Sequence, residues 1–336
     1  MTNNKKTKNL ISLAILLAGL FLGSLFVDIG QIVKGNGYSQ KNLNKSDIFE
    51  ASGKTWVAFS EPAIFLSVVN DDECEKCNPN EVLVWLRKIM PTVSAKKINF
   101  NSEEGKKMIA DFEIKTLPAF VFEKEIDKTD FFVQAEKIFQ AKNDKYVLNT
   151  QALGAPVGKY VQLPKINESD ASFGKKDAEV KVVVFSDLQS PNSKDFYKIF
   201  RETMKNYEDK ANFVFKELAS NDQPQSMSAT LSVECALEQG KFWEYADNLF
   251  EKQTEWSVKK DTAIFKTYAR NLKLNTADFN KCLDEKKFQE KIDANKKEME
   301  DIGIIGTPTV FVNDKFMSGV VDAEQFKKDI EEEINK

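Results

Sequence analysis

Residues 182–196, with the sequence VVVFSDLQSPNSKDF, are the most informative stretch of this chain. The run of valines and phenylalanine at 182–185 predicts a buried strand, and the residues from 194 onward predict the start of a helix. Between them lies Ser190-Pro191-Asn192-Ser193, in which two serines flank a proline and an asparagine. The stretch therefore predicts a strand–loop–helix junction.

The composition limits the classes of function. At 336 residues the chain is long enough for two domains, and 42% hydrophobic with 30% charged residues is typical of globular protein. The net charge of −4 gives no overall positive field, so we expect no nucleic-acid partner. The chain contains no histidine, which excludes Ser-His-Asp hydrolysis, histidine-ligated metals and imidazole acid–base catalysis.

The amino terminus predicts a membrane anchor. Lys5, Lys6 and Lys8 precede an uncharged, mostly apolar run at 10–27. As a helix this run would span about 27 Å, close to the roughly 30 Å of a hydrocarbon core. The lysines favour a cytoplasmic start, which places the chain after the anchor outside the cytoplasm. A cleaved signal peptide and a buried soluble helix are the alternatives, but no convincing small-x-small cleavage site is present.

We therefore expect a single-pass protein of the cell membrane whose soluble domains lie outside the cytoplasm. The expected segments are a cytoplasmic tip and signal-anchor at 1–33, a polar tether at 34–54, a first domain at 55–163, a linker at 164–177 and a second domain at 178–336.

The first domain alternates strand and helix patterns. Strands are predicted at 63–69, 96–100, 119–122 and 146–148, and helices at 81–89, 102–112 and 131–141. Cys74-Glu75-Lys76-Cys77 follows the first strand, and Pro118 opens a later strand, 44 residues after Cys74. This order resembles thioredoxin. The resemblance implies a cis-proline at Pro118, next to Leu117, that shapes a substrate groove beside the cysteines.

The Cys74–Cys77 pair has three interpretations. A structural disulfide across so short a loop is worth only about 2 kcal/mol in the chain-entropy estimate. A zinc site would need four ligands, and the chain has neither histidine nor a second CxxC. A redox pair is favoured, and by the resemblance Cys74 would be the attacking thiolate and Cys77 the resolving thiol.

The surroundings of Cys74 argue against a strongly oxidising centre. Acidic residues disfavour its thiolate, and Lys76 offsets only part of their charge; these residues are Asp71, Asp72, Glu73 and Glu75. Pro79 fits near the first turn of a helix, so we expect that helix to begin after the cysteines, where its dipole stabilises the thiolate less. A reductase, an isomerase or a slow exchanger fits better.

The second domain resembles the DsbA-like proteins of the thioredoxin superfamily. The motifs that carry the resemblance are FGKKDA at 173–178, the stretch at 182–196, ECALEQGKFW at 234–243 and GIIGTPTVFVN at 303–313. The resemblance implies a thioredoxin fold with a helical insertion, a closing helix at 326–334, and a strand entered through a cis-proline at Pro308.

This second domain lacks the family's redox pair. The family motif Cys-Pro-x-Cys is here Ser190-Pro191-Asn192-Ser193, and two serines cannot form a disulfide. Thr307 and Pro308 would still shape a groove beside the serines, so peptide binding without exchange is one interpretation and a purely structural domain is the other.

Cys235 and Cys282 lie on separate predicted helices, 47 residues apart. Some DsbA-like relatives bridge positions in this helical region, and closing such a loop is worth about 4 kcal/mol in the entropy estimate. Two buried free thiols are the alternative.

The sequence thus predicts an α/β protein with an N-terminal transmembrane helix followed by two thioredoxin-like domains, the second with a DsbA-like helical insertion. Its expected function is thiol–disulfide exchange at Cys74 and Cys77, without cofactor or metal, on exported proteins that carry thiols or disulfides. The alternative function is a non-catalytic, anchored chaperone or scaffold with structural disulfides only.

Overall fold

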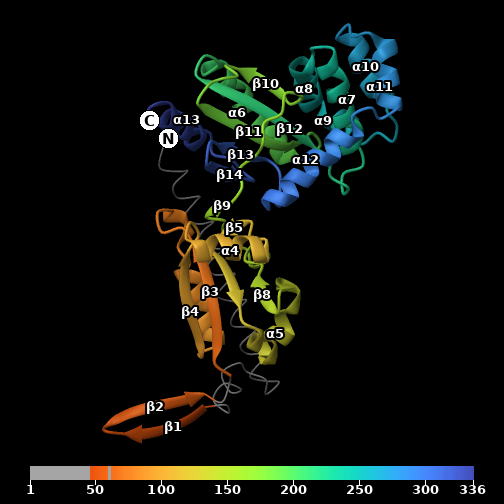
Figure 1. Cartoon of the computed structure of the whole chain (residues 1–336). Helices are drawn as coiled ribbons and strands as arrows, with labels where there is room; N and C mark the ends of the chain where they lie inside the picture. The colour runs from red at the N-terminus through yellow and green to blue at the C-terminus, as the bar shows by residue number, and fades with distance from the viewer. Residues whose placement is uncertain (1–45, 60–61) are drawn as a thin grey trace, which may run out of the picture. The chain divides into compact units, whose positions relative to one another are not determined.

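The computed structural model of the chain describes residues 46–59 and 62–336 (Figure 1). The apolar run at 10–27 lies outside these residues. Within them, no helix combines the length and the apolar character that crossing a bilayer requires. The chain forms two compact units, one of Met1–Ser67, as far as it is described, with Asn80–Lys96 and Phe120–Asn149, the other of Val68–Pro79, Lys97–Ala119 and Thr150–Lys336. The division into domains at 55–163 and 178–336 stays a prediction.

A β-hairpin begins the described chain. β1 (Ser46–Ala51) pairs antiparallel with β2 (Lys54–Phe59). The two turn residues, Ser52 and Gly53, have positive φ angles of 55° and 72°, the conformation that favours two-residue hairpin turns. The described part of the segment that the sequence suggests is only a polar tether therefore includes a β-strand.

The first five-stranded sheet has the strand order β4-β3-β6-β8-β7. Its strands are β3 (Ile64–Asn70), β4 (Val93–Asn99), β6 (Ala119–Phe122), β7 (Phe139–Lys142) and β8 (Lys145–Leu148). α3 (Asn80–Ile89) follows β3 in the chain, and α4 (Glu103–Phe112) follows β4. The sequence predicts β3, β4, β6 and both helices to within three residues.

Local chemistry sets the ends of α4. Ser102 caps its start, since the Ser102 hydroxyl accepts a hydrogen bond of 3.0 Å from the Gly105 N–H. Glu103 and Glu104 in the first turn complement the positive end of the helix dipole. The helix ends at Glu113, whose φ of 50° turns the backbone out of the helix.

The helix predicted at 131–141 is wrong in its second half. After the short 3₁₀ helix η2 (Lys124–Lys128), α5 (Asp130–Ala135) is followed by η3 (Glu136–Ile138) and then by strand β7. Asn143 and Asp144, with φ of 49° and 57°, form the turn to β8, and the Phe139 ring packs edge-on against Phe122 at 5.6 Å. These contacts override the helical pattern of the sequence.

The second five-stranded sheet has the order β10-β12-β11-β13-β14. Its strands are β10 (Ala171–Gly174), β11 (Val180–Asp187), β12 (Ala211–Leu218), β13 (Thr309–Val312) and β14 (Lys315–Ser318). β11 and β12 are parallel, and the other neighbours are antiparallel. Every residue of β12 and β13 is buried, which places the sheet at the centre of its core.

Helices surround this sheet in the order of the thioredoxin fold. α6 (Pro191–Asn206) follows β11, and α13 (Ala323–Ile334) closes the chain. Between β12 and β13 lies a helical insertion, drawn together in Figure 1: α7 (Ser226–Glu238), α8 (Phe242–Glu251), α9 (Gln253–Trp256), α10 (Ala263–Asn271), α11 (Thr276–Asp284) and α12 (Gln289–Ile302).

β10 occupies part of the predicted linker at 164–177. Ala171 is fully buried, and the neighbouring Asp170 forms an ion pair of 2.9 Å with Lys216, whose side chain is 0% exposed. The sequence at 164–177 is mostly polar, and for that reason it predicts a linker. The ion pair and the pairing with β12 instead make it an edge strand.

Candidate functional site

The Cys74–Cys77 disulfide lies in the loop after β3. The two Cα atoms are 5.2 Å apart, and Cys77 ends the one-turn 3₁₀ helix η1 (Glu75–Cys77). A hydrogen bond of 3.0 Å from the Cys77 N–H to the Cys74 carbonyl closes the turn. The Cys77 side chain is buried and Cys74 is half-buried, so Cys74 is the more accessible of the two cysteines.

The helix after the cysteines begins at Asn80, with Pro79 buried before it. Both sulfurs therefore precede the first turn of α3 rather than lying within it. The stabilisation that a helix N-terminus gives a thiolate is strongest in its first turn. The prediction from Pro79 that the helix begins after the cysteines is confirmed.

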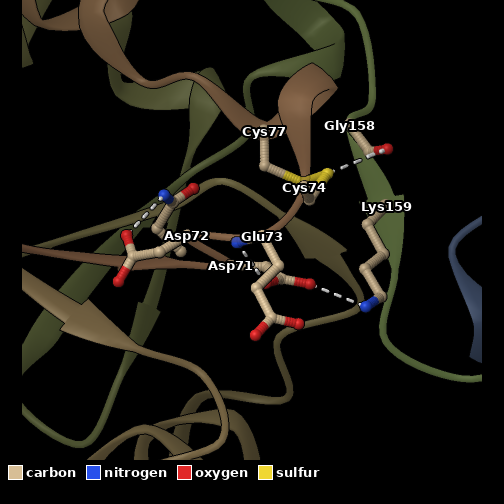
Figure 2. Close-up of a disulfide and its surroundings, with 8 residues drawn as sticks. Asp71, Asp72, Glu73, Cys74, Cys77, Gly158 and Lys159 are labelled. Atoms are coloured by element: carbon tan, nitrogen blue, oxygen red, sulfur yellow. Dashed lines mark hydrogen bonds and ion pairs between the residues drawn. A yellow bond between two sulfur atoms is a disulfide. The ribbon is translucent and has the colours of Figure 1, made fainter.

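An ion pair lies beside the disulfide. Lys159 Nζ is 2.7 Å from Asp71 Oδ2, and the Asp71 carboxylate also accepts a hydrogen bond from the Glu73 N–H (Figure 2). Burial by itself raises the pKa of Asp71, but the hydrogen bonds from Lys159 and Glu73 together with the Lys159 charge lower it below its usual value. Asp71 is thus a buried anion that Lys159 neutralises, and Glu73 and Glu75 are exposed.

Pro118 is connected to the disulfide through one residue of another segment. The Leu117–Pro118 peptide bond is cis, and β5 (Thr116–Leu117) pairs antiparallel with β9 (Lys159–Tyr160). The Gly158 N–H donates to the Leu117 carbonyl at 2.9 Å. The Gly158 carbonyl oxygen lies 3.7 Å from Cys74 Sγ (Figure 2). Leu117 and Cys74 therefore share a neighbour.

Gly158 and Lys159 are the residues that the sequence analysis missed. Gly158 lies 84 residues after Cys74, and the run LGAPVGK at 153–159 reads only as a turn-rich segment that follows η4 (Gln151–Leu153). A Cβ on Gly158 would lie 2.7 Å from the Lys76 carbonyl oxygen and 2.9 Å from Cys77 Sγ. Only glycine allows the chain to approach the disulfide so closely.

Ser190, Pro191 and Ser193 form the start of α6. Ser190 is the N-cap, and its hydroxyl accepts a hydrogen bond of 3.3 Å from the Ser193 N–H, while Pro191 occupies the first turn. Gln253 fixes the loop by donating to the Ser190 carbonyl at 3.0 Å. Ser193 is 0% exposed, and its hydroxyl has no hydrogen-bond partner in the described part of the chain. Ser190 therefore caps the helix, and the Ser193 hydroxyl is a buried polar group without a hydrogen bond among the described residues.

A buried carboxyl precedes these serines. Asp187 accepts hydrogen bonds of 2.8 Å from the Gln189 N–H and from the Ser226 hydroxyl. Burial raises the pKa of Asp187, although these hydrogen bonds oppose the shift. A carboxyl with a raised pKa can exchange a proton with a nearby thiol. The residues at Ser190 and Ser193 are serines, so they provide no thiol for such an exchange.

Thr307 and Pro308 lie at the same edge of the second sheet as the serines. The Thr307–Pro308 bond is cis, and Phe185 of β11 pairs with Thr309 of β13. The loop after β11 and the turn before β13 therefore leave the sheet at one edge. No hydrogen bond joins Thr307 or Pro308 to the serines within the described residues.

Cys235 of α7 and Cys282 of α11 form a disulfide with Cα atoms 5.9 Å apart. Both side chains are buried. The bridge closes a loop of 47 residues, for which the chain-entropy estimate is about 4 kcal/mol. Its position far along the chain from Cys74, with both sulfurs buried, suits a structural link between two helices.

The second sheet, with the cis-proline Pro308 at the start of β13, belongs to an α/β fold of thioredoxin type. A family model described as Thioredoxin matches residues 166–332. Disulfide bond formation protein D of Bacillus subtilis is 30% identical over 170 residues, which cover 48% of this chain and 76% of the relative. A putative protein-disulfide oxidoreductase of Rickettsia bellii is 28% identical over 154 residues, covering 44% and 59%. Among solved structures, oxidised BdbD from Bacillus subtilis is 26% identical with a TM-score of 0.44, covering 50% of this chain and 95% of that one.

The chain belongs to the thioredoxin superfamily, and within it to the DsbA-like thiol–disulfide oxidoreductases. The matched residues 166–332 include Ser190 and Ser193 but neither Cys74 nor Cys77. The half of the chain that carries the family likeness is therefore the half without a CxxC.

Proposed function

We propose that this protein is a membrane-anchored, extracytoplasmic thiol–disulfide oxidoreductase whose reactive pair is Cys74 and Cys77. The observation that carries the proposal is the unequal exposure of the two sulfurs, with Cys74 half-buried and Cys77 buried. An incoming sulfur then reacts at Cys74, and Cys77 is protected until it resolves the mixed disulfide. The lysine-flanked apolar run at 10–27 supports the anchor and the extracytoplasmic location.

Exchange in the reducing direction has two steps. The Cys74 thiolate attacks one sulfur of a substrate disulfide, which forms a mixed disulfide and releases the other substrate sulfur as a thiolate. The Cys77 thiolate then attacks Cys74 Sγ, forms the Cys74–Cys77 disulfide and releases the second substrate thiolate. Two electrons pass to the substrate, whose thiolates take up the protons that the cysteines lost. A dithiol protein partner would reduce the pair again.

The acidic surroundings favour the reductase or isomerase direction. Glu73 and Glu75 flank Cys74 and are exposed; Lys76 offsets only part of their charge, and Lys159 is paired with Asp71. A strongly oxidising centre requires a stabilised thiolate. The negative charges of Glu73 and Glu75 disfavour a stabilised Cys74 thiolate.

In this proposal the serine-bearing half binds substrate or partner without exchange. Its cis-proline Pro308 and the loop with Ser190 leave the sheet at the same edge, as a peptide groove would require. The function that competes with the whole proposal is a non-catalytic scaffold in which both disulfides are structural.

The test uses the reduced full chain and a peptide disulfide. Cys74→Ser should abolish thiol-dependent reduction, and Cys77→Ser should trap a mixed disulfide that mass spectrometry assigns to Cys74. Ser190→Ala is the matched control and should retain the wild-type rate. Equal rates for wild type and Cys74→Ser would overturn the enzyme proposal and leave the scaffold.

A further inference from the structure

The two-residue strand β9 pairs with the edge of β5, next to the Cys74–Cys77 disulfide. The Gly158 N–H donates to the Leu117 carbonyl at 2.9 Å, and the Val161 N–H donates to the Lys115 carbonyl at 2.9 Å. We call residues 157–161 the strap. Exposed strand edges pair readily with extended peptides. At β5 this pairing is already made by the chain itself.

The strap also covers the sulfur that reacts first. The Gly158 carbonyl oxygen lies 3.7 Å from Cys74 Sγ, on the side of the disulfide that Figure 2 shows facing β9. Gly158 is buried, and the space beside it is too small for a methyl group. A peptide that paired with Leu117 beside Cys74 would need the place that Gly158 holds.

Side chains on either side of Gly158 hold the strap down. Lys159 pairs with Asp71 at 2.7 Å and lies 4.7 Å from the centre of the Phe100 ring. Tyr160 is buried, and its ring packs against Phe316 at 4.6 Å. The backbone pairing of the strap with β5 is short, however, because β9 is only two residues long.

We propose that the strap is an internal mimic of a bound peptide, which occupies the edge of β5 and must move aside before a polypeptide substrate pairs there and reaches Cys74. The inference rests on the proposed exchange at Cys74. Small disulfides that need no backbone pairing approach Cys74 through its half-exposed side and are not affected by the strap.

Two substrates with the same leaving group test this on the full reduced chain. One is dithiobis(nitrobenzoate), and the other is a short cysteine peptide whose sulfur carries the same nitrothiobenzoate in a disulfide. In each reaction the Cys74 thiolate attacks a disulfide sulfur and releases coloured nitrothiobenzoate. The ratio of the two rates therefore reports access for a peptide, independent of the reactivity of the thiolate.

Val161→Pro removes the N–H that pairs with Lys115 without altering charge near Cys74. We expect it to raise the rate with the peptide about fivefold, the factor that one backbone hydrogen bond typically supplies, and to leave the rate with the small disulfide unchanged. Gln162→Pro is the control, because Gln162 is exposed and its N–H makes no hydrogen bond within the described chain.

A second measurement needs no strap variant. Hydrogen exchange of the strap amides in Cys77→Ser should become at least about tenfold faster when Cys74 carries the peptide than when it carries nitrothiobenzoate. Unchanged exchange, or equal effects of Val161→Pro on both substrates, would overturn the strap alone. Failure of the wild type to react with either substrate would overturn the exchange function and the strap with it.

Discussion

Lys159 Nζ lies 2.7 Å from Asp71 Oδ2, and so joins the strap to the loop that carries Cys74. The Asp71 side chain is 6% exposed and that of Lys159 is 31% exposed. An ion pair with one buried member differs from a surface pair, because the loss of one partner leaves a charge that water cannot reach.

Lys159→Met should therefore destabilise the oxidised protein by about 1–3 kcal/mol. Methionine keeps much of the length of the side chain and removes the charge. Lys106→Met is the control, since the pair of Lys106 with Glu103 has exposed side chains and is 3.6 Å long, for which a change below about 0.5 kcal/mol is expected. Urea unfolding measures both variants. Equal losses of unfolding free energy in the two variants would show that the Lys159–Asp71 pair contributes no more than a surface ion pair.

The same pair predicts a pH dependence. The pKa of Asp71 in the folded chain is lowered, since the hydrogen bonds and the charge of Lys159 outweigh burial. A carboxyl of this kind stabilises the fold above its unfolded pKa of about 3.9, and the stabilisation is lost as the pH falls through the folded pKa. The difference in unfolding free energy between wild type and Lys159→Met should be constant from pH 7 to about pH 5 and shrink below about pH 4. A difference that stays constant down to about pH 2 would contradict this assignment.

The Cys235–Cys282 disulfide should contribute more to stability than the Cys74–Cys77 disulfide. The first closes a separation of 47 residues and the second one of 3, which gives about 4 against about 2 kcal/mol in the chain-entropy estimate. Urea unfolding of the two double alanine variants, each compared with the oxidised wild type, measures the difference. A larger loss from the pair at Cys74 would contradict the structural role of the helical bridge.

Much of the fold is predictable because its signals are local. The strand at 182–185 and the helix that starts near Ser102 depend on neighbouring residues, and the structure has both. The cis bonds before Pro118 and Pro308 are implied by the resemblance to thioredoxin and to DsbA-like proteins, and the structure has them as well. The prediction of a helix at 131–141 fails because the Phe139 ring packs against Phe122, which lies outside the segment that carries the helical pattern. A helical pattern within one segment contains no information about such a partner.

The candidate site divides in the same way. Cys74, Cys77 and Pro118 can be found from spacing and from the resemblance to thioredoxin. Gly158 and Lys159 cannot, because they reach Cys74 through the pairing of β9 with β5, and two-residue strands have no recognisable sequence pattern. The proximity of Gly158 and Lys159 to Cys74 is therefore known only from the structure.

Ser193 and Ser226 provide the last prediction, because both are 0% exposed but their hydroxyls differ in their hydrogen bonds. The Ser193 hydroxyl has no partner in the described part of the chain, whereas the Ser226 hydroxyl donates to Asp187 at 2.8 Å and accepts from the Ser220 N–H at 3.0 Å. Ser193→Ala should thus stabilise the protein by about 1 kcal/mol, because it removes a buried polar group that is not satisfied, and Ser226→Ala should destabilise it by about 1–3 kcal/mol. Urea unfolding of the oxidised variants measures both changes. A loss of stability in Ser193→Ala would contradict the absence of a hydrogen-bond partner for this hydroxyl.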